Sequence, residues 1–496
     1  MKLMPRLLLA ATAWIGCASA GAQQPLIEAS QTVTLVASDS AQLLNPIPCP
    51  VDSNWVAYSR LVQNRKELHF FHRGDSTFRF ITSSPAPAEG EVDLFSARED
   101  KGCDDQLDWC PVKRKGKIWF AFIGSGPSSN PDVYVANLDD LKPFRLTDQG
   151  NEQFTEYHPR WSPDGRDLVF GSSRTGGGDL YLISSVFEYL DKPPVLRRLT
   201  VNDGEDLFPA WCPAPRSGLL AYTAYQKGAK KGRMGLAINL IDLARGGSVA
   251  TASVNENFDC FRPSWDPLSG DRIAYYASKL PENQIGQVDA SIFESNIGLL
   301  ELKPDEQGGF TVQQVVGQGQ REFAAGKVLT NLYSGPTWVT GSQCLLAVKR
   351  LEDQFTPLYA VNLKTWQLGF GRVEEPLNLK AKFPRDPVML NNLLFAGAQD
   401  GNQYQITAAR LQGRLVSNLQ YHHYTLDGRM PPPPSDGGIW SFLTSPLLLR
   451  RTDILLNRPI VGGPVLAAVV YIIATGGDDG PGRVPIPMPP YPPGMP

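Results

Sequence analysis

Acidic residues recur at a fixed distance before a tryptophan along the middle of the chain. Asp104, Glu156 and Asp206 each stand five residues before a tryptophan, and Asp259 stands six residues before another. If these segments fold alike, the carboxylates occupy neighbouring copies of one position. A concave wall with charges of one sign concentrates the electric field, so it would attract a cation or a basic peptide. We treat the four carboxylates as a candidate binding site, with solvated turn residues as the alternative.

Motifs of known catalytic sites are missing from the sequence. It contains no G-x-S-x-G nucleophile elbow, no H-E-x-x-H metal motif and no Walker-type phosphate loop. The five histidines are scattered, with His69 and His72 in one segment and His158 in another. We therefore predict no catalytic residue, no metal site and no cofactor, while a cation bound by the carboxylates stays open. We expect His158 to have a structural role.

The tryptophans belong to a repeated unit of roughly 50 residues. The clearest copy reads YHPRWSPDGRDLVFGSSR at 157–174, continues as DLYLI, and ends in RLT at 198–200. Its anchor tryptophans stand at positions 109, 161, 211, 265 and 338, at intervals of 52, 50, 54 and 73 residues. Two flanking copies lack the tryptophan, one at Pro48 and one in which we place Asp386 at the tryptophan position. The chain thus contains seven units.

Each unit is typical of four short strands. The tryptophan strand is followed by a P-D-G turn, where glycine supplies the positive φ that a hairpin needs. An apolar strand, an L-Y-L strand and an R-L-T strand follow. Four strands per unit at this period indicate a blade of a β-propeller. The sequence predicts an all-β fold, a seven-bladed β-propeller in preference to six or eight blades. We expect the tryptophans to pack between blades and the arginines to form pairs at blade edges.

The pattern P-x-W-S-P-D-G, F-x-S-x-R, D-L-Y resembles the TolB-like and WD40-like propeller repeats of bacterial cell-envelope proteins. The likeness is strongest over 157–183 and extends over roughly 46–420. It implies an exported propeller, periplasmic or at the cell surface, that binds other proteins. TolB itself carries an α/β domain before its propeller, whereas here about 25 residues separate the predicted signal peptide from the first unit. Because of this difference, the resemblance by itself does not imply the TolB partnership with a peptidoglycan-associated lipoprotein.

The N-terminal segment has the features of a targeting signal. Residues 1–22 combine Lys2 and Arg6 with an apolar run and A-x-A patterns, which is typical of a secretory signal peptide. Lipoprotein processing at Cys17 is the alternative. Residues 23–45 then precede the first unit and can add a strand that closes the ring.

The C-terminal segment differs in composition from the repeats. We place the propeller at 46–425 and a Pro-rich and Gly-rich tail at 426–496. The tail contains an apolar segment at 460–475. As a helix it would span roughly 24 Å, at about 1.5 Å per residue, which is less than the roughly 30 Å of a hydrocarbon core. We expect this segment to dock on protein rather than to cross a membrane.

Export to an oxidising compartment would permit disulfides. Cys103 and Cys110 are separated by six residues and form the easiest pair to close. The alternative is that the cysteines are small buried hydrophobic residues.

The net charge of the chain and its expected export restrict the classes of function that it can have. The chain has 47 Lys and Arg against 50 Asp and Glu, a net charge of −3, which argues against nucleic-acid binding. We predict a non-catalytic protein-binding scaffold, not an enzyme, with an envelope protein or a peptidoglycan-associated partner. The alternatives are a carbohydrate-active enzyme (a polysaccharide lyase or hydrolase) and a structural component of a surface assembly. Membrane association would run through Cys17 or the 460–475 segment.

Overall fold

The computed structural model describes residues 27–413 and Leu415, with internal gaps of which the longest are 83–106, 279–293 and 317–327. Predictions on the signal peptide, Cys17 and the tail at 426–496 lie outside the described residues. Among the helices that the structure describes, none is both long enough and apolar enough to cross a membrane.

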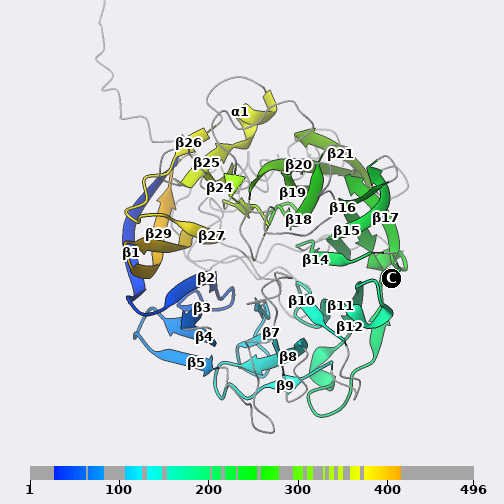
Figure 1. The fold of residues 1–496 in the computed structure, drawn as a ribbon, viewed down its shortest axis with the longest axis horizontal. Coiled ribbons are helices and arrows are strands. Elements are labelled where there is room, and N and C mark those ends of the chain that lie inside the picture. Colours follow the sequence, from blue (N-terminus) through cyan, green and yellow to red (C-terminus); the bar gives the residue numbers. More distant parts are fainter. Residues whose placement is uncertain are drawn as a thin grey trace, which may run out of the picture. The chain divides into compact units, whose positions relative to one another are not determined.

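The part of the chain up to Arg429 forms one compact unit whose strands build seven blades around a ring (Figure 1). The strands of each blade are given from the inner strand outward. Blade 1 consists of β2 (Gln42–Pro48), β3 (Trp55–Val62), β4 (Arg65–His72) and β5 (Phe78–Thr82), and blade 2 of β6 (Asp108–Trp109), β7 (Trp119–Ser125), β8 (Pro131–Asn137) and β9 (Phe144–Arg145). Blade 3 consists of β10 (Glu156–Trp161), β11 (Leu168–Ser172), β12 (Asp179–Ile183) and β13 (Leu196–Arg198), and blade 4 of β14 (Asp206–Trp211), β15 (Leu219–Lys230), β16 (Arg233–Asp242) and β17 (Ser248–Ser253).

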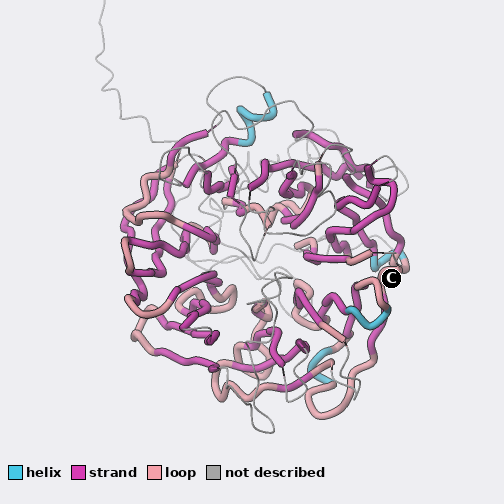
Figure 2. Tube along the Cα trace, in the orientation of Figure 1, coloured by secondary structure: helices cyan, strands magenta, loops and turns pink. Residues whose placement is uncertain are grey.

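Blade 5 consists of β18 (Asp259–Trp265), β19 (Arg272–Ser278), β20 (Glu294–Pro304) and β21 (Phe310–Val316). Blade 6 consists of β23 (Thr337–Trp338), β24 (Cys344–Lys349), β25 (Leu358–Asn362) and β26 (Glu374–Pro376). Blade 7 consists of β27 (Arg385–Leu390), β28 (Leu393–Asp400), β29 (Gln403–Gln412) and β1 (Glu28–Ser38). The described helical segments are short and lie at the periphery (Figure 2): α1 (Leu363–Leu368) and the 3-10 turns η2 (Ser173–Thr175), η3 (Val186–Glu188) and η4 (Leu243–Arg245). The predicted all-β, seven-bladed propeller is confirmed.

The ring is closed by a blade made from two distant parts of the chain. Strand β1 pairs antiparallel with β29, from Glu28 opposite Gln412 to Ser38 opposite Tyr404. In Figure 1 the blue strand β1 lies beside the orange strand β29, and the chain then enters blade 1 through β2. A shared blade leaves β29 no free edge, and unpaired edges are what folded β proteins avoid.

The long interval between the fifth and sixth units contains an added strand. Strand β22 (Val328–Leu329) pairs with β20 on one side and with β24 on the other. It joins blades 5 and 6 into one hydrogen-bonded sheet. The 73-residue interval between anchor tryptophans thus carries a connection between blades rather than an eighth blade.

The inner strands of five blades contain the same β-bulge, just before a proline. The bulge residues are non-glycine residues with positive φ between 46° and 54°: Asn45, His158, Phe208, Arg262 and Asp386. Proline has no N–H to donate to a ladder, so it is tolerated at bulges and on edge strands such as these. We call the residue before this proline the bulge position.

The bulge corrects the alignment of the seventh unit. In blade 3 the anchor Trp161 pairs with Leu168, and in blade 7 it is Met389 that pairs with Leu394. Asp386, which the sequence alignment placed at the tryptophan position, instead occupies the bulge position. The error arose because a shift of three residues still aligned a proline with a proline.

The anchor tryptophans connect successive blades through hydrogen bonds. In four blades the indole Nε1 donates to a backbone carbonyl of the preceding blade, at the residue before that blade's anchor position. The pairs are Trp109 to Ile47 (3.0 Å), Trp211 to Arg160 (3.1 Å), Trp265 to Ala210 (2.8 Å) and Trp338 to Ser264 (3.0 Å). The repeated tryptophan therefore links blades 2, 4, 5 and 6 each to the blade before it.

The P-D-G turn of blade 3 requires its glycine. Gly165 has φ of 62°, and a Cβ there would lie 2.6 Å from Cγ2 of Val112 and 2.7 Å from Sγ of Cys110. A glycine is needed both for the backbone conformation and for the close approach of blade 2.

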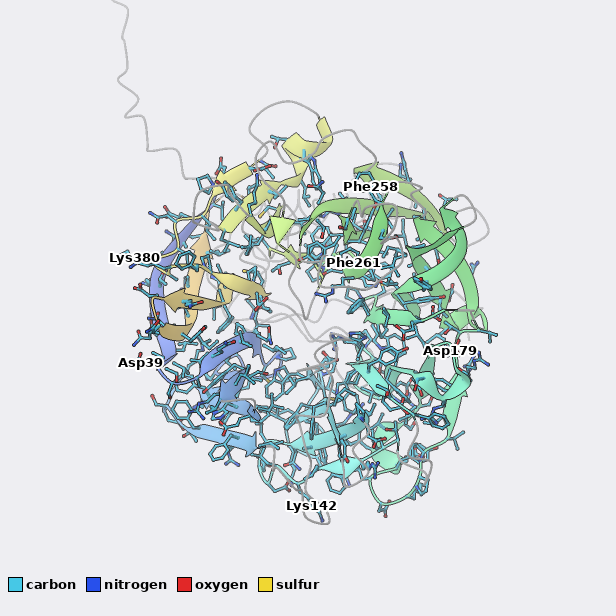
Figure 3. The ribbon with its side chains drawn as sticks, viewed as in Figure 1. Asp39, Lys142, Asp179, Phe258, Phe261 and Lys380 are labelled. Carbon is cyan, nitrogen blue, oxygen red and sulfur yellow. The ribbon has the colours of Figure 1, made fainter. Side chains whose placement is uncertain are left out.

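The R-L-T segments close the outer edges of blades 2 and 3. In blade 2 the carboxylate of Asp132 accepts from Arg145 Nε at 2.9 Å and from Thr147 Oγ1 at 2.9 Å. In blade 3 Asp179, which lies on β12 (Figure 3), pairs with Arg198 at 2.7 Å. We call these two Asp–Arg pairs the outer clamps. They match the expectation of arginine pairs at blade edges.

Candidate functional site

Three of the four predicted acidic residues begin the inner strands of neighbouring blades. Glu156 and Asp206 pair with Ser172 and Ala224 at the same register step, four residues beyond the partner of the anchor tryptophan. Asp259 pairs with Ser278, which lies five residues beyond Ile273, the partner of the anchor Trp265. All three are buried, with relative exposures of 1% or less. Asp104 and Cys103 lie outside the described residues.

The buried carboxylates have partners within the protein. Glu156 Oε1 lies 2.5 Å from the guanidinium of Arg174, and Asp259 accepts a hydrogen bond from the backbone N–H of Leu236 in the preceding blade at 3.0 Å. Burial raises the pKa of Glu156 to about 7, against the opposing charge of Arg174. The sequence predicted these groups at the mouth of a channel, whereas the structure places them inside the blades. Their binding of a cation or a basic peptide stays a prediction.

A cavity of about 290 Å³ opens on the inner strands of blades 3 to 6. Its lining combines two guanidinium groups with aromatic rings, prolines and one hydroxyl, and the described lining contains no carboxylate. The lining residues are Arg160, Phe208, Pro209, Ala210, Trp211, Pro213, Arg262, Pro263, Ser264, Trp265, Pro267 and Gly335. Concave sites with mostly apolar walls and a few placed polar groups are typical ligand sites.

Side chains from the bulge positions of blades 3, 4 and 5 contact one another, and two of them, Phe208 and Arg262, line the cavity. The rings of His158 and Phe208 have centroids 4.2 Å apart, and the guanidinium carbon of Arg262 lies 4.6 Å from the centroid of Phe208. His158 is 2% exposed and Arg262 is 4% exposed. The cation–π contact fixes the guanidinium of Arg262 against the aromatic face. We call these three residues the bulge column.

The imidazole of His158 is buried without a hydrogen-bond partner among the described residues. This holds for both Nδ1 and Nε2. Burial lowers its pKa well below the ordinary range, and the positive charges of Arg160 and Arg262 lower it further. His158 is therefore neutral at pH 7, and both guanidinium groups act on this one part of the wall.

The carboxylate of Asp108 interacts electrostatically with Arg160, which lines the cavity. Its Oδ2 accepts the backbone N–H of Trp161 at 2.7 Å. Burial raises the pKa of Asp108 to about 6, and the charge of Arg160 opposes that rise. Asp108 is not part of the described cavity lining.

The bulge column was not predicted, although the sequence contains a signal for it. The units align on tryptophan and on the acidic residues, and the structural role expected of His158 did not extend to the equivalent residues of the other units. Reading that column across the units yields Asn45, His158, Phe208, Arg262 and, in the corrected alignment, Asp386. The proline and the backbone conformation at this position stay the same, while the residue type changes from blade to blade. Such a position is a signal for the inner wall of the ring.

The cysteines that the structure describes are all buried: Cys49, Cys110, Cys212, Cys260 and Cys344. Cys110 Sγ donates to the carbonyl of Val112 at 3.2 Å, and burial raises the pKa of this thiol to about 12. Because Cys103 lies outside the described residues, the Cys103–Cys110 disulfide stays a prediction. Among the residues described, no group of three His, Cys, Asp or Glu side chains is arranged to hold a metal ion.

Comparison with known proteins points in the same direction as the repeat pattern. The chain matches no protein-family model. A segment of 111 residues is 32% identical to the Tol-Pal system protein TolB of Desulfosudis oleivorans. The propeller is TolB-like. The match covers 22% of this chain and 22% of that protein, so the chain spans about a fifth of the TolB relative that it matches.

Solved structures extend the comparison to the fold. TolB from Acinetobacter baumannii is 17% identical, with 56% of this chain and 55% of that chain aligned at a TM-score of 0.36. A puromycin-hydrolyzing peptidase of Mycobacterium tuberculosis is 13% identical, with 80% of this chain and 58% of that chain aligned at a TM-score of 0.51. The peptidase likeness concerns the fold of the TolB-like propeller.

Proposed function

We propose that this TolB-like propeller is an exported, non-catalytic scaffold that binds a protein partner in the cell envelope through the cavity on its inner wall. The observation that carries the proposal is the composition of that cavity, in which Arg160 and Arg262 stand among Trp211, Trp265 and Phe208. Tryptophan and arginine are enriched at the energetic centres of protein interfaces. The repeat pattern and the TolB match support the envelope as the compartment and an envelope or peptidoglycan-associated protein as the partner.

The partner is tested by placing a photo-crosslinking residue at Ser264, in the cavity, and producing the full chain in its native cells. We expect one defined protein adduct, which mass spectrometry identifies. The matched control carries the same residue at Val195, which is 72% exposed and is not part of the cavity lining. Equal adducts from both positions, or no adduct from Ser264 or from a second cavity position, Ala210, would contradict the proposal.

Export is tested on the mature protein. We expect its N-terminus at Gly21 or Gln23, or blocked by an acylated Cys17, and we expect the protein in the periplasmic or membrane fraction. N-terminal sequencing and cell fractionation measure both. An unprocessed protein that begins at Met1 in the cytoplasm would contradict the compartment.

A further inference from the structure

We infer that the cavity on the inner wall receives an aromatic side chain of a peptide segment, which it recognises by apolar contact and without an ion pair. The inference rests on the proposed function and names the chemistry of the partner's binding segment. It differs from the sequence-based expectation, in which a row of carboxylates would attract a cation or a basic peptide.

The indole donors and backbone acceptors of this wall are paired with one another. Each hydrogen bond runs from an indole Nε1 to a backbone carbonyl of the preceding blade: Trp211 to Arg160, Trp265 to Ala210 and Trp338 to Ser264, at 3.1, 2.8 and 3.0 Å. The indoles of Trp211 and Trp265 therefore offer ring atoms to a ligand, since their N–H groups already donate within the ring of blades.

The two arginines of the lining are held by the protein itself. Arg262 is 4% exposed, and its guanidinium carbon lies 4.6 Å from the centroid of the Phe208 ring. Arg160 Nη1 donates to the carbonyl of Pro159 at 2.9 Å, and the carboxylate of Asp108 acts on Arg160 electrostatically. Both arginines have further interactions within the protein. We therefore assign binding to the apolar part of the lining.

The part of the lining that keeps exposed surface is largely apolar. Trp211, Pro213 and Pro267 are half-buried, so part of each ring stays accessible, and the methyl group of Ala210 is half-buried too. Leu268 follows Pro267 directly in the chain and is 40% exposed, although most large hydrophobic side chains of the described residues are buried. Exposed apolar surface around a cavity is typical of a site that another molecule covers.

The size and the walls of the cavity favour an aromatic ring as the bound group. A volume of about 290 Å³ has room for one or two side chains. Aromatic rings that pack against each other gain free energy beyond that of the buried area. A ring also brings a large contact area with few rotatable bonds, which keeps the entropy loss on binding small. A charged side chain would lose its hydration here without gaining a partner.

The test measures binding of capped pentapeptides to the full mature chain by fluorine NMR. The probe has 4-fluorophenylalanine at its centre, between glycine and alanine residues, and the competitors have leucine, glutamine, glutamate or lysine there. We expect the aromatic peptide to bind at least about tenfold more tightly than the three polar ones and about threefold more tightly than the leucine peptide. Equal or tighter binding of any competitor, or no binding of the probe, would overturn the inference.

Salt provides a second measurement on the same peptide. Because no ion pair forms, raising the NaCl concentration from roughly 50 to 500 mM should weaken binding less than about twofold. A larger loss of affinity would mean that charge carries the recognition, and it would overturn the inference.

Substitutions locate the site. Ala210→Leu places a larger side chain in the cavity and should weaken binding of the aromatic peptide at least about tenfold. The matched control Ala37→Leu makes the same change on the exposed surface of β1, outside the cavity lining, and should change affinity less than about twofold. If Ala210→Leu fails to fold, Ser264→Phe fills the cavity from blade 5 instead. Unchanged binding in a folded lining variant would overturn the inference.

The two proposals fail separately. A protein adduct at Ser264 in cells, together with no preference for the aromatic peptide, would overturn the inference and leave the scaffold function in place. Binding of the aromatic peptide in vitro, without any protein adduct in cells, would do the reverse.

Discussion

Arginine recurs at one fixed position on the outer edges of blades 2 and 3. On the inner wall of blades 3 to 5 the residue type at the bulge position changes from blade to blade. At the outer edge, Arg145 and Arg198 pair with aspartates on the neighbouring strand of the same blade. The same residue types recur there at the same positions. At the inner wall the bulge position is His158, then Phe208, then Arg262.

This difference separates structural residues from residues that can select a ligand. A position with the same residue in successive blades satisfies a need that every blade has, such as closing its last strand. A position whose residue type changes from blade to blade meets no side-chain requirement that the blades share, even where the backbone conformation is the same. The bulge column therefore marks the part of the ring where blades stop being equivalent.

Breaking an outer clamp should have the largest effect on stability. Asp132→Ala leaves Arg145 and Thr147 without their carboxylate, and the loss of one partner from a buried charge pair costs about 3 kcal/mol of unfolding free energy. Denaturant unfolding at pH 7 measures this. The control Asp400→Ala breaks the exposed Lys382–Asp400 pair, whose side chains are 61% and 52% exposed, and should cost less than about 1 kcal/mol. Equal losses would mean that the clamp has no special role.

The anchor tryptophans allow a sharper comparison within one position. Trp211 donates to the carbonyl of Arg160, while Trp161 Nε1 has no hydrogen-bond partner among the described residues. Phenylalanine keeps most of the apolar contact and removes the donor. Trp211→Phe should therefore cost about 1 kcal/mol more than Trp161→Phe, the net value of one hydrogen bond. The same denaturant series measures the difference, and a larger loss in Trp161→Phe would contradict it.

His158 should make the protein sensitive to acid. Its pKa in the folded state lies below the value of about 6.5 in the unfolded chain, so below about pH 6.5 the unfolded state binds a proton that the folded state rejects. This contribution lowers stability as the pH falls. His158→Phe removes it, and Phe208 shows that phenylalanine is accepted at a bulge position. The melting temperature between pH 7.5 and 5 should fall less in the variant than in the natural protein.

Glu156 should act in the opposite direction, which provides the control. Its folded pKa of about 7 is raised above the ordinary value of 4.5. Its stabilising contribution is present below pH 4.5 and is lost as the pH rises to about 7. Glu156→Gln removes this compensation, so the melting temperature should fall more steeply on acidification than in the natural protein. A change of slope with the same sign in both variants would rule out this assignment.

Much of the fold was predictable from local patterns. The number of blades follows from the repeat, because each unit carries its own turn and its own alternating strands, as the segment around Trp161 shows. The role of the arginines in the R-L-T segments was also predictable, since Arg198 and Asp179 stand in one unit and pair within it.

The candidate site was only partly predictable. Glu156 and Asp206 do share one register position, as their spacing from tryptophan implied. Their burial did not follow from spacing, because it depends on how the next blade packs against the strand. The misplacement of Asp386 has a similar origin, since a bulge changes the register without changing the count of residues in the sequence.

By itself, the sequence determined an all-β chain of seven repeated units with constant anchors. Those features depend on periodicity, turn residues and the interval between tryptophans, all of which act over short distances along the chain. The sequence allowed residues 23–45 to add a closing strand, but only the tertiary structure decided that β1 completes the last blade, 380 residues away from its partner strand, as the hydrogen bond from Ser30 to Arg410 records. It alone brought His158, Phe208 and Arg262 together. The reason is that ring closure and stacking between blades join residues that are 50 or more positions apart, where the local pattern of one unit carries no information about its neighbour.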